Sequence, residues 1–277
     1  MKSRLAVSDA LYLKPLIFGL DRPDSPFEPV TDIPAKNALK LSERSEEIRG
    51  AFLSPIDYAR HGAEYCIVPD ICIASSSPSG TIQLVLKSHL HDIERVAIDV
   101  RFTSEIILAK IILSEKFRNQ PTHPQLQFLP MNPDVDAMLA KADAALIVQD
   151  HPQVIERAGS FTLDLVEEWI DLTGLPYIHG FWVGREGELS ELEAQALLAA
   201  KKDGTRLKSQ IAQTVAHQQN SSLTALTQYI ESFSYDFGET EKEGLEEFMQ
   251  YAFFHGVIPD VPDIVFFDIE SSPPSQN

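Results

Sequence analysis

A strand, a short polar turn and an apolar helix follow one another over residues 96–113, and the turn places Thr103 and Ser104 where the helix begins. The first turn of a helix presents unpaired backbone N–H groups and a partial positive charge. Small hydroxyls there cap the helix, and with the N–H groups they can bind a carboxylate or a phosphate. We therefore expect Thr103 and Ser104 to hold an anionic small molecule. The alternative is an ordinary helix cap, which for such a pair taken alone is the more common situation.

The charge of the chain limits what it can bind. Its 277 residues carry a net charge of -18, and the isoelectric point is about 4.8. A diffuse negative charge repels phosphate backbones and anionic membranes, which argues against nucleic-acid and membrane partners. It also repels a small anion. The sequence therefore predicts that local hydroxyls and helix dipoles hold such a ligand, without arginine or metal.

The apolar run over residues 66–74 contains Cys66 and Cys72, whose spacing fits no common zinc pattern. We expect both to be buried hydrophobic residues without a disulfide. Pro69 in the same run argues against an uninterrupted central strand. Charged residues and a proline interrupt any signal-peptide core near the N-terminus, and no apolar run approaches the roughly 20 residues of a membrane span. A cytoplasmic protein is expected.

Strands and helices alternate in the middle of the chain. The pattern predicts, in order, a strand over 95–99, a helix over 103–117, a strand over 125–129, a helix over 132–141 and a strand over 144–148. This βαβαβ order is typical of a parallel sheet in an α/β fold. Ligands of such sheets lie beyond the carboxyl ends of the strands, where segments 99–104 and 149–150 fall.

The strands before and after this unit predict two lobes. Lobe one is expected to comprise residues 1–87 and 184–277, with the C-terminal helices packed on it, and lobe two residues 88–183. Two strands, near Val85 and near Phe181, are expected to cross between the lobes. A cleft at such a junction is the default ligand site.

Seven segments resemble, in their order, those of one known family. They are PLIFGL at 15–20, GAFLSPIDYAR at 50–60, YCIVPDICIAS at 65–75, DVRFTSEIILAKIIL at 99–113, DAALIVQD at 143–150, LVEEWIDLTGLPYIHGFWVGR at 165–185 and FMQYAFFHGVIPDVPDIVFF at 248–267. As a group they resemble the menaquinone-biosynthesis family of the futalosine pathway, whose type member is chorismate dehydratase. The resemblance implies a two-lobed fold like that of type 2 periplasmic binding proteins, with a central cleft, used in the cytoplasm.

The chain departs from this family near the expected site. The family carries Tyr-Leu-Asn a few residues before the proline, with the asparagine in the substrate site, and Tyr12 occupies that position here. The Ser-Val pair that follows the serine loop is Thr81-Ile82, and the Gly-Asp that ends the third strand of the insert is Gln149-Asp150. Thr81 keeps a hydroxyl, whereas Tyr12 has no carboxamide.

The resemblance implies the elimination of water from chorismate to give 3-[(1-carboxyvinyl)oxy]benzoate. Chorismate carries two carboxylates, and the loss of a ring proton and of the neighbouring hydroxyl makes its ring aromatic. We expect Thr103 and Ser104 to hold one carboxylate, and Ser54 and Thr81 to hold the other. Ser75 is also expected to contact the substrate.

A general base must reach the ring proton. Asp150, Tyr12 and a carboxylate of the substrate itself are candidates, and the polar, uncharged character of the expected site favours the substrate-assisted route. The sequence shows no cluster of metal ligands and no phosphate-binding loop, so no cofactor is expected. The expected partner is a small anionic carboxylate, and the expected assembly is a monomer or a homodimer.

Two other functions remain open. The first is a non-catalytic binding protein for a small carboxylate, in which Tyr12 marks lost catalysis. The second is the sister activity of the family, which makes a dihydroxynaphthoate from a cyclised futalosine derivative. The segment over residues 99–113 resembles that branch less.

Overall fold

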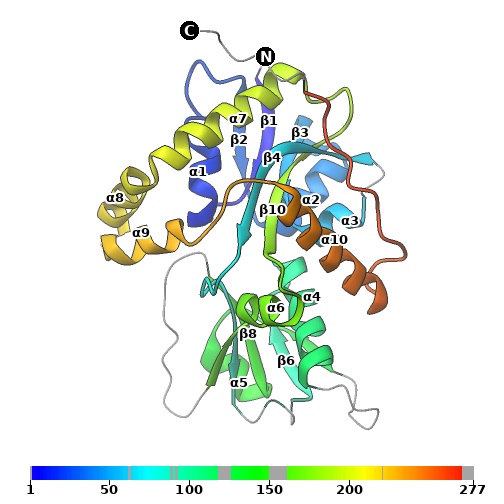
Figure 1. Ribbon diagram of the computed structural model, residues 1–277. Coiled ribbons are helices and arrows are strands. Elements are labelled where there is room, and N and C mark those ends of the chain that lie inside the picture. The colour runs from blue at the N-terminus through cyan, green and yellow to red at the C-terminus, as the bar shows by residue number, and fades with distance from the viewer. Residues whose placement is uncertain are drawn as a thin grey trace.

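Two five-stranded sheets, each covered by helices, form two lobes (Figure 1). The computed structural model describes residues 2–61, 64–87, 90, 93–117, 126–149, 161–219 and 221–269. The predicted α/β class with two lobes is confirmed. Among the described helices, none combines the length and the apolar character that crossing a membrane requires.

The sheet of lobe one runs in the order β2-β1-β3-β10-β4. Its strands are β1 (Ser3–Val7), β2 (Phe27–Thr31), β3 (Ile48–Leu53), β4 (Cys66–Ser75) and β10 (Tyr177–Gly184). β1 is parallel to β2 and β3, whereas β10 is antiparallel to β3 and β4. The carboxyl ends of β1, β2 and β3 therefore lie at one end of the sheet.

β4 is an edge strand, so the missing N–H of Pro69 does not take a hydrogen bond from a neighbouring strand. β4 can therefore continue through Pro69. The next residue, Asp70, has a φ of 60°, in the left-handed region, and the pairing with β10 shifts register here. Pro69 thus lies in an irregular part of an edge strand. This agrees with the expectation that Pro69 does not belong to an uninterrupted central strand. Cys66 and Cys72 are buried free thiols, as predicted.

The sheet of lobe two runs in the order β7-β6-β8-β5-β9. Its strands are β5 (Ile82–Leu86), β6 (Arg95–Ile98), β7 (Gln127–Pro130), β8 (Ala144–Val148) and β9 (Phe161–Asp164). β6 is parallel to β7 and β8, and α4 (Thr103–Ile112) and α5 (Val135–Lys141) connect them, which confirms the predicted βαβαβ unit. A π-helical turn, η5 (Leu113–Phe117), extends α4, and β5 is antiparallel to β8 and β9.

Sheet membership differs from the expected lobe boundaries. β5 pairs within the sheet of lobe two although it precedes residue 88, and β10 pairs within the sheet of lobe one although the expected second lobe extends to residue 183. The chain crosses between the lobes after β4 and again between α6 (Leu165–Thr173) and β10. We propose boundaries within residues 76–81 and 174–176, because backbone pairing changes sheet there.

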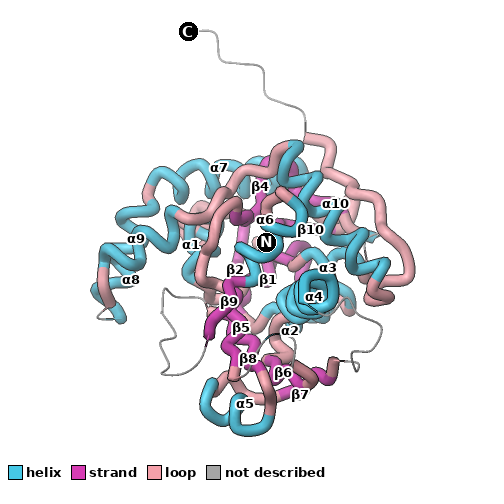
Figure 2. Tube along the Cα trace, turned by 60° about the horizontal axis from the view of Figure 1, so that its bottom comes forward, coloured by secondary structure: helices cyan, strands magenta, loops and turns pink. Residues whose placement is uncertain are grey.

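The two faces of the sheet in lobe one bind different helices (Figure 2). Along β1, Leu5 and Val7 belong to one buried cluster and Ala6 to another, since neighbouring side chains of a strand point to opposite faces. The first face carries η1 (Leu11–Leu13), α1 (Lys14–Ile17), α7 (Glu191–Arg206), α8 (Lys208–Gln219) and α9 (Leu223–Glu231). The second carries α2 (Pro34–Ser42), α3 (Pro55–Ala59) and α10 (Glu239–Phe254), with η2 (Ser45–Glu47) following α2.

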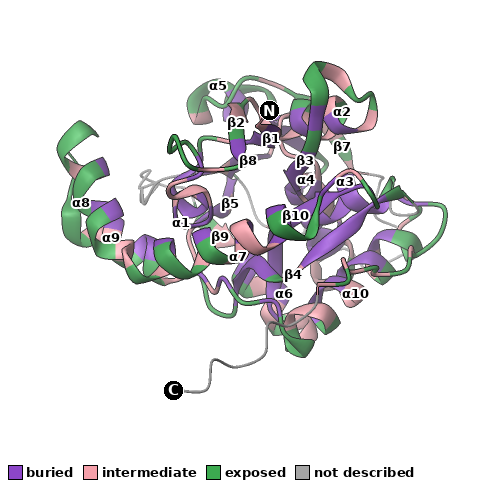
Figure 3. Cartoon of the chain, turned by 90° about the horizontal axis from the view of Figure 1, so that it is seen from above, coloured by how far each residue is buried: buried purple, intermediate pink, exposed green. Residues whose placement is uncertain are grey.

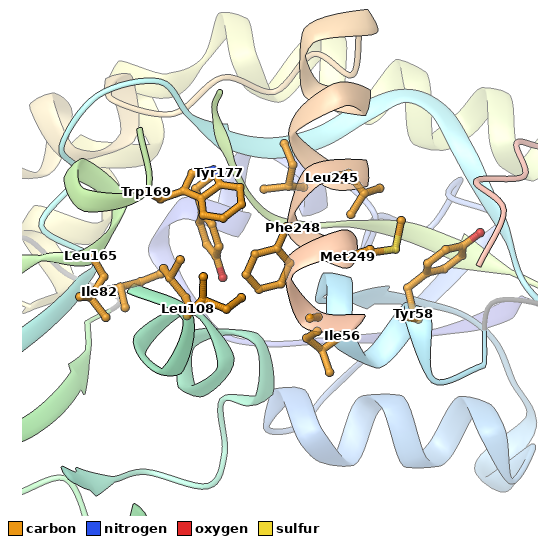
Figure 4. Packing of buried hydrophobic residues seen from close by; sticks show 14 of the residues in the cluster. Ile56, Tyr58, Ile82, Leu108, Leu165, Trp169, Tyr177, Leu245, Phe248 and Met249 are labelled. Atoms are coloured by element: carbon orange, nitrogen blue, oxygen red, sulfur yellow. The ribbon is translucent and has the colours of Figure 1, made fainter. Parts of the chain in front are cut away.

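One apolar core is shared by both lobes (Figure 4). Trp169 of α6 and Tyr177 of β10 each meet Phe248 of α10 edge to face, with 5.6 Å between ring centroids in both pairs. Leu108 of α4 is buried in the same cluster. α10 therefore packs against both lobes. The strands β4 and β10 are largely buried, whereas the outer surface of α8 is exposed (Figure 3).

α7 packs closely against α1, the helix that follows Tyr12, and this contact depends on Gly204. A Cβ built on Gly204 would lie 1.9 Å from the carbonyl oxygen of Pro15. We expect Gly204→Ala to push the helices apart and to lower the free energy of unfolding by about 2 kcal/mol, although alanine favours a helix. Urea unfolding measures this change.

Asp203→Ala, at the exposed neighbouring position of α7, is the matched control, and it should change the free energy of unfolding by less than about 0.5 kcal/mol. Equal stability of Gly204→Ala and the wild type would contradict the close contact.

Candidate functional site

A cavity of about 300 Å³ lies between the lobes, at the carboxyl ends of parallel strands from both sheets. From lobe one it is lined by residues 8–10 and Tyr12, which follow β1, and by residues 31–34, at and after the end of β2. Residues 101–102, after β6, and residues 148–149, at the end of β8, line it from lobe two. This is the end of a parallel sheet at which α/β proteins bind ligands.

Tyr12 lines this cavity from lobe one. It lies in η1, and its carbonyl oxygen accepts a hydrogen bond from the Tyr235 hydroxyl at 2.9 Å. Its ring packs against Phe233 and His179, at 5.5 and 5.8 Å between centroids. The phenol ring of Tyr12, packed on one side by these two rings, thus forms part of the cavity wall.

Arg101 brings a positive charge to the wall that lobe two contributes. Asp99, after β6, accepts hydrogen bonds from Arg101 Nε at 2.7 and 3.0 Å, from Arg101 Nη2, and from the Arg101 backbone N–H at 3.0 Å. The guanidinium carbon also lies 5.4 Å from the centroid of the Phe102 ring. Arg101 is therefore a lining residue that the expectation of a site without arginine did not include. The signal was in the sequence, since Arg101 lies two positions before Thr103 in the same turn.

Two aspartates of lobe one also line the cavity, and each is paired with lysine. Asp9 binds Lys14, and Asp32 binds Lys40 at 3.1 Å and Lys36 at 3.6 Å. The backbone N–H of the following residue and Lys40 lower the pKa of Asp32. Because these charges are compensated locally, the acidic net charge of the chain does not exclude an anion from this cavity.

The starts of α3 and α4 meet beside the cavity, and Ser104 joins them. Its hydroxyl oxygen accepts a hydrogen bond from the Ile56 backbone N–H at 2.9 Å and donates to Ser54 Oγ at 2.9 Å. Ser54 in turn donates to Asp57 Oδ2 at 2.8 Å, and Thr103 also hydrogen-bonds the Asp57 carboxylate. Ser54 and Ser104 thus bind each other across the lobes, instead of lining the cavity as expected for ligand contacts.

Two buried carboxyl groups lie at this junction, one from each lobe. Glu105 is in the first turn of α4 and Asp57 in the first turn of α3, and they are 6% and 4% exposed. Burial, with a smaller effect of the Asp57 charge, raises the pKa of Glu105 to about 7. Burial also raises the pKa of Asp57, against the hydrogen bonds from Ser54 and Thr103. The sequence prediction missed Glu105, whose signal is a carboxylate at the start of an otherwise apolar helix.

β4 and β10 add buried polar groups behind Tyr12. Ser75 Oγ and His179 Nε2 are 2.9 Å apart, so the contact observed for Ser75 is with this histidine. Burial lowers the pKa of His179 to about 3, which keeps its ring neutral at pH 7. The hydroxyl of Tyr177 is buried and has no hydrogen-bond partner among the described residues. Burial, with smaller effects of Glu105 and Tyr12, raises the pKa of Tyr177.

Thr81 lies behind the wall of lobe two. Its hydroxyl donates to the Tyr229 hydroxyl at 3.4 Å, and Tyr229 donates to the carbonyl oxygen of Gln149 at 3.1 Å. Gln149 itself lines the cavity. Asp150, a predicted base, lies outside the described residues. In the described ranges, no three histidine, cysteine or carboxylate side chains are grouped so that they could hold a metal ion.

Comparisons with known proteins agree with this architecture. The family model described as "Menaquinone biosynthesis" matches residues 3–253. A chorismate dehydratase from Thermus thermophilus is 26% identical over 230 residues, which cover 79% of this chain and 84% of that protein.

Two solved structures show the fold. Protein AF1704 from Archaeoglobus fulgidus has a TM-score of 0.71 at 19% identity, over 93% of this chain and 98% of that chain. The periplasmic aliphatic sulphonate binding protein SsuA from Escherichia coli has a TM-score of 0.66 at 14% identity, over 100% and 95% of the two chains. The expected fold, like that of periplasmic binding proteins, is therefore confirmed.

The pKa of Glu105 predicts a pH-dependent stability. The carboxyl has its ordinary pKa of 4.5 in the unfolded chain and about 7 in the folded protein, so its stabilisation is complete below pH 4.5 and is lost as the pH rises to about 7. Over this range the wild type should lose roughly 3 kcal/mol of the free energy of unfolding relative to Glu105→Gln. Urea unfolding across these pH values measures the difference.

Glu115→Gln, in the turn that extends α4, is the control and should follow the wild type except for its own contact with His255. A difference between wild type and Glu105→Gln that does not change with pH would contradict the raised pKa.

Proposed function

The chain belongs to the menaquinone-biosynthesis family, and from this premise we propose that it removes water from chorismate to give 3-[(1-carboxyvinyl)oxy]benzoate. The 26% identical chorismate dehydratase supports this reaction. The observation that carries the proposal is the cavity between the lobes, which has Tyr12 on one wall and Arg101 on the other.

Arg101 is the proposed anchor for one carboxylate of the substrate. A guanidinium binds a carboxylate with charge-assisted hydrogen bonds, and Asp99 holds this guanidinium in one place beside the cavity. Phe102 and Tyr12 offer aromatic surface from opposite lobes, which suits a flat ring. Thr103 belongs to the same turn and is the proposed second contact of this carboxylate, for which its hydroxyl must leave the Asp57 carboxylate.

The other carboxylate is proposed to lie toward lobe one. The remaining expected contacts, Ser54, Ser75, Thr81 and Ser104, are hydrogen-bonded to protein groups around the cavity. We propose that they shape its walls, and that a ligand reaches them only if it displaces these bonds. The substrate is thereby oriented mainly by Arg101 and the aromatic rings.

The chemical step needs little assistance because it makes an aromatic ring. The bond from a ring carbon to hydrogen breaks, its electron pair forms the new double bond, and the neighbouring carbon–oxygen bond breaks to release hydroxide, which leaves as water. Tyr12 and Asp150 remain the proposed enzyme groups for this proton transfer. No cofactor enters this reaction, and a biosynthetic role fits the cytoplasmic location that the sequence predicts.

A binding protein for a small carboxylate is the second candidate. The similarity in fold to a sulphonate binding protein supports it, and so does the absence of the family asparagine at Tyr12. Such a protein would bind chorismate without converting it.

Purified wild-type protein incubated with chorismate should form an aromatic product, because the chain shares its family and 26% of its aligned residues with a chorismate dehydratase. Ultraviolet absorbance and chromatography against the authentic compound measure the product. Binding of chorismate in calorimetry without product would exclude the lyase and favour the binding protein.

Arg101→Gln should raise KM for chorismate about tenfold or more, because it removes the charge that anchors a carboxylate. Steady-state kinetics measure this change. Arg101→Lys keeps the charge but loses the planar fork, so its KM should lie between those of the wild type and Arg101→Gln.

Arg95→Gln is the matched control, because Arg95 lies at the opposite end of β6 and pairs with Asp143. Its KM should stay within about twofold of the wild type. An Arg101→Gln variant with the KM of the wild type would remove Arg101 from the binding site.

A further inference from the structure

The end of α9 and the residues that follow it contact both walls of the cavity between the lobes. Residues 229–235, which we call the bridging segment, lead from α9 past β4 toward α10 (Figure 1). Ser234 and Ala74 of β4 exchange backbone hydrogen bonds at 2.9 and 3.0 Å, in an antiparallel bridge. Because β4 belongs to the sheet of lobe one, this bridge fixes the segment to lobe one.

Toward lobe one, two aromatic residues of the bridging segment hold Tyr12. The ring of Phe233 packs against the Tyr12 ring, with 5.5 Å between centroids. The hydroxyl of Tyr235 donates a hydrogen bond to the Tyr12 carbonyl oxygen at 2.9 Å. Since Tyr12 lines the cavity, the position of this wall depends on both contacts.

Toward lobe two, Tyr229 of the bridging segment reaches the end of β8. Its hydroxyl donates to the carbonyl oxygen of Gln149 at 3.1 Å and accepts a hydrogen bond from the Thr81 hydroxyl at 3.4 Å. Gln149 lines the cavity, and its backbone N–H donates to the Thr81 carbonyl oxygen at 2.7 Å. One short segment therefore bonds the Tyr12 wall and the Gln149 wall, which belong to opposite lobes.

The hydroxyl of Tyr229 can be removed without disturbing the rest of the segment. The Tyr229 side chain is buried, and its ring meets the Phe233 ring edge to face, with 5.1 Å between centroids. A phenylalanine keeps this ring contact but cannot hydrogen-bond the Gln149 carbonyl oxygen. The substitution thus changes the contact with lobe two and leaves the contacts with Tyr12 in place.

We propose that the bridging segment sets the distance between the two walls of the cavity, and that Tyr229 is its positioning residue for the substrate. This inference rests on the proposed function, because it takes the cavity as the chorismate site. The substrate must meet Arg101 on one wall and Tyr12 on the other. Walls that are already held at the right distance lose less freedom when the ligand binds, and this strengthens binding.

Calorimetric titration with chorismate tests the inference. Tyr229→Phe should raise Kd about fivefold or more, because the hydrogen bond that holds the Gln149 wall is lost. In steady-state kinetics KM should rise by a similar factor while kcat stays within about twofold, since Tyr12 and Asp150 are unchanged. A side chain that only supported the fold would lower the midpoint of urea unfolding and leave Kd of the folded protein unchanged.

Tyr58→Phe is the matched control. The Tyr58 hydroxyl also donates to a backbone carbonyl, that of Asp263 at 2.9 Å, and also accepts one hydrogen bond, from the Val265 N–H at 3.4 Å. Tyr58 is buried in lobe one, and the residues it bonds follow α10. We expect Tyr58→Phe to lower the urea midpoint about as much as Tyr229→Phe, with Kd within about twofold of the wild type.

Tyr235→Phe keeps the test decisive if Tyr229→Phe does not fold. It removes the hydroxyl that holds the Tyr12 carbonyl oxygen, on the other side of the bridging segment. It should raise Kd for chorismate about threefold or more.

The outcomes separate this inference from the proposed function. A wild-type Kd in Tyr229→Phe, or in Tyr235→Phe if Tyr229→Phe is unfolded, overturns the inference, and so does an equal rise of Kd in Tyr58→Phe. Wild-type protein that binds chorismate without forming product overturns the dehydratase alone, because Kd still tests the inference. Wild-type protein that does not bind chorismate overturns both. A raised Kd in Tyr229→Phe with an unchanged Kd in Tyr58→Phe supports the inference.

Discussion

The hydrogen bonds of Ser104 hold the two lobes together at the point on which the site depends. The Ser104 hydroxyl accepts a hydrogen bond from the Ile56 N–H, at the start of α3, and donates one to Ser54, the N-cap of that helix. Ser104 and Ile56 are fully buried, so losing Ser104 would leave a helix N–H without a partner in the core. The relative position of the two sheets, and with it the width of the cavity between them, follows from this junction and from α10, which packs against both lobes.

Several polar side chains are buried where the lobes meet. Glu105, Asp57, Tyr177 and His179 are all nearly inaccessible, and their pKa values are displaced mainly by burial. A core built for stability alone would place apolar side chains there. One of the four, His179, packs against Tyr12 of the cavity wall, with 5.8 Å between ring centroids. A polar group is thus buried next to the proposed ligand cavity, at a cost in stability.

The cavity also reconciles an acidic protein with an anionic ligand. The net charge of -18 is a property of the whole surface, whereas binding depends on charges within a few ångströms of the ligand. At the cavity, Lys14 and Lys40 compensate Asp9 and Asp32, and Asp99 both compensates the guanidinium of Arg101 and keeps it in place. The charges close to the cavity, and not the net charge of the whole chain, decide which ligands can enter the cavity.

The sequence by itself determined the α/β class, the parallel unit of lobe two and the strand-to-helix turns at Ser54 and Thr103, because periodicity and helix capping act between residues close in the chain. Tertiary structure decided which lobe β5 and β10 join, since strand pairing links distant segments. It also decided that Ser104 bonds the other lobe and that Glu105, in the first turn of α4, is buried. Hydroxyl and carboxyl groups bind ligand or protein equally well, so their partners depend on what the fold brings within reach.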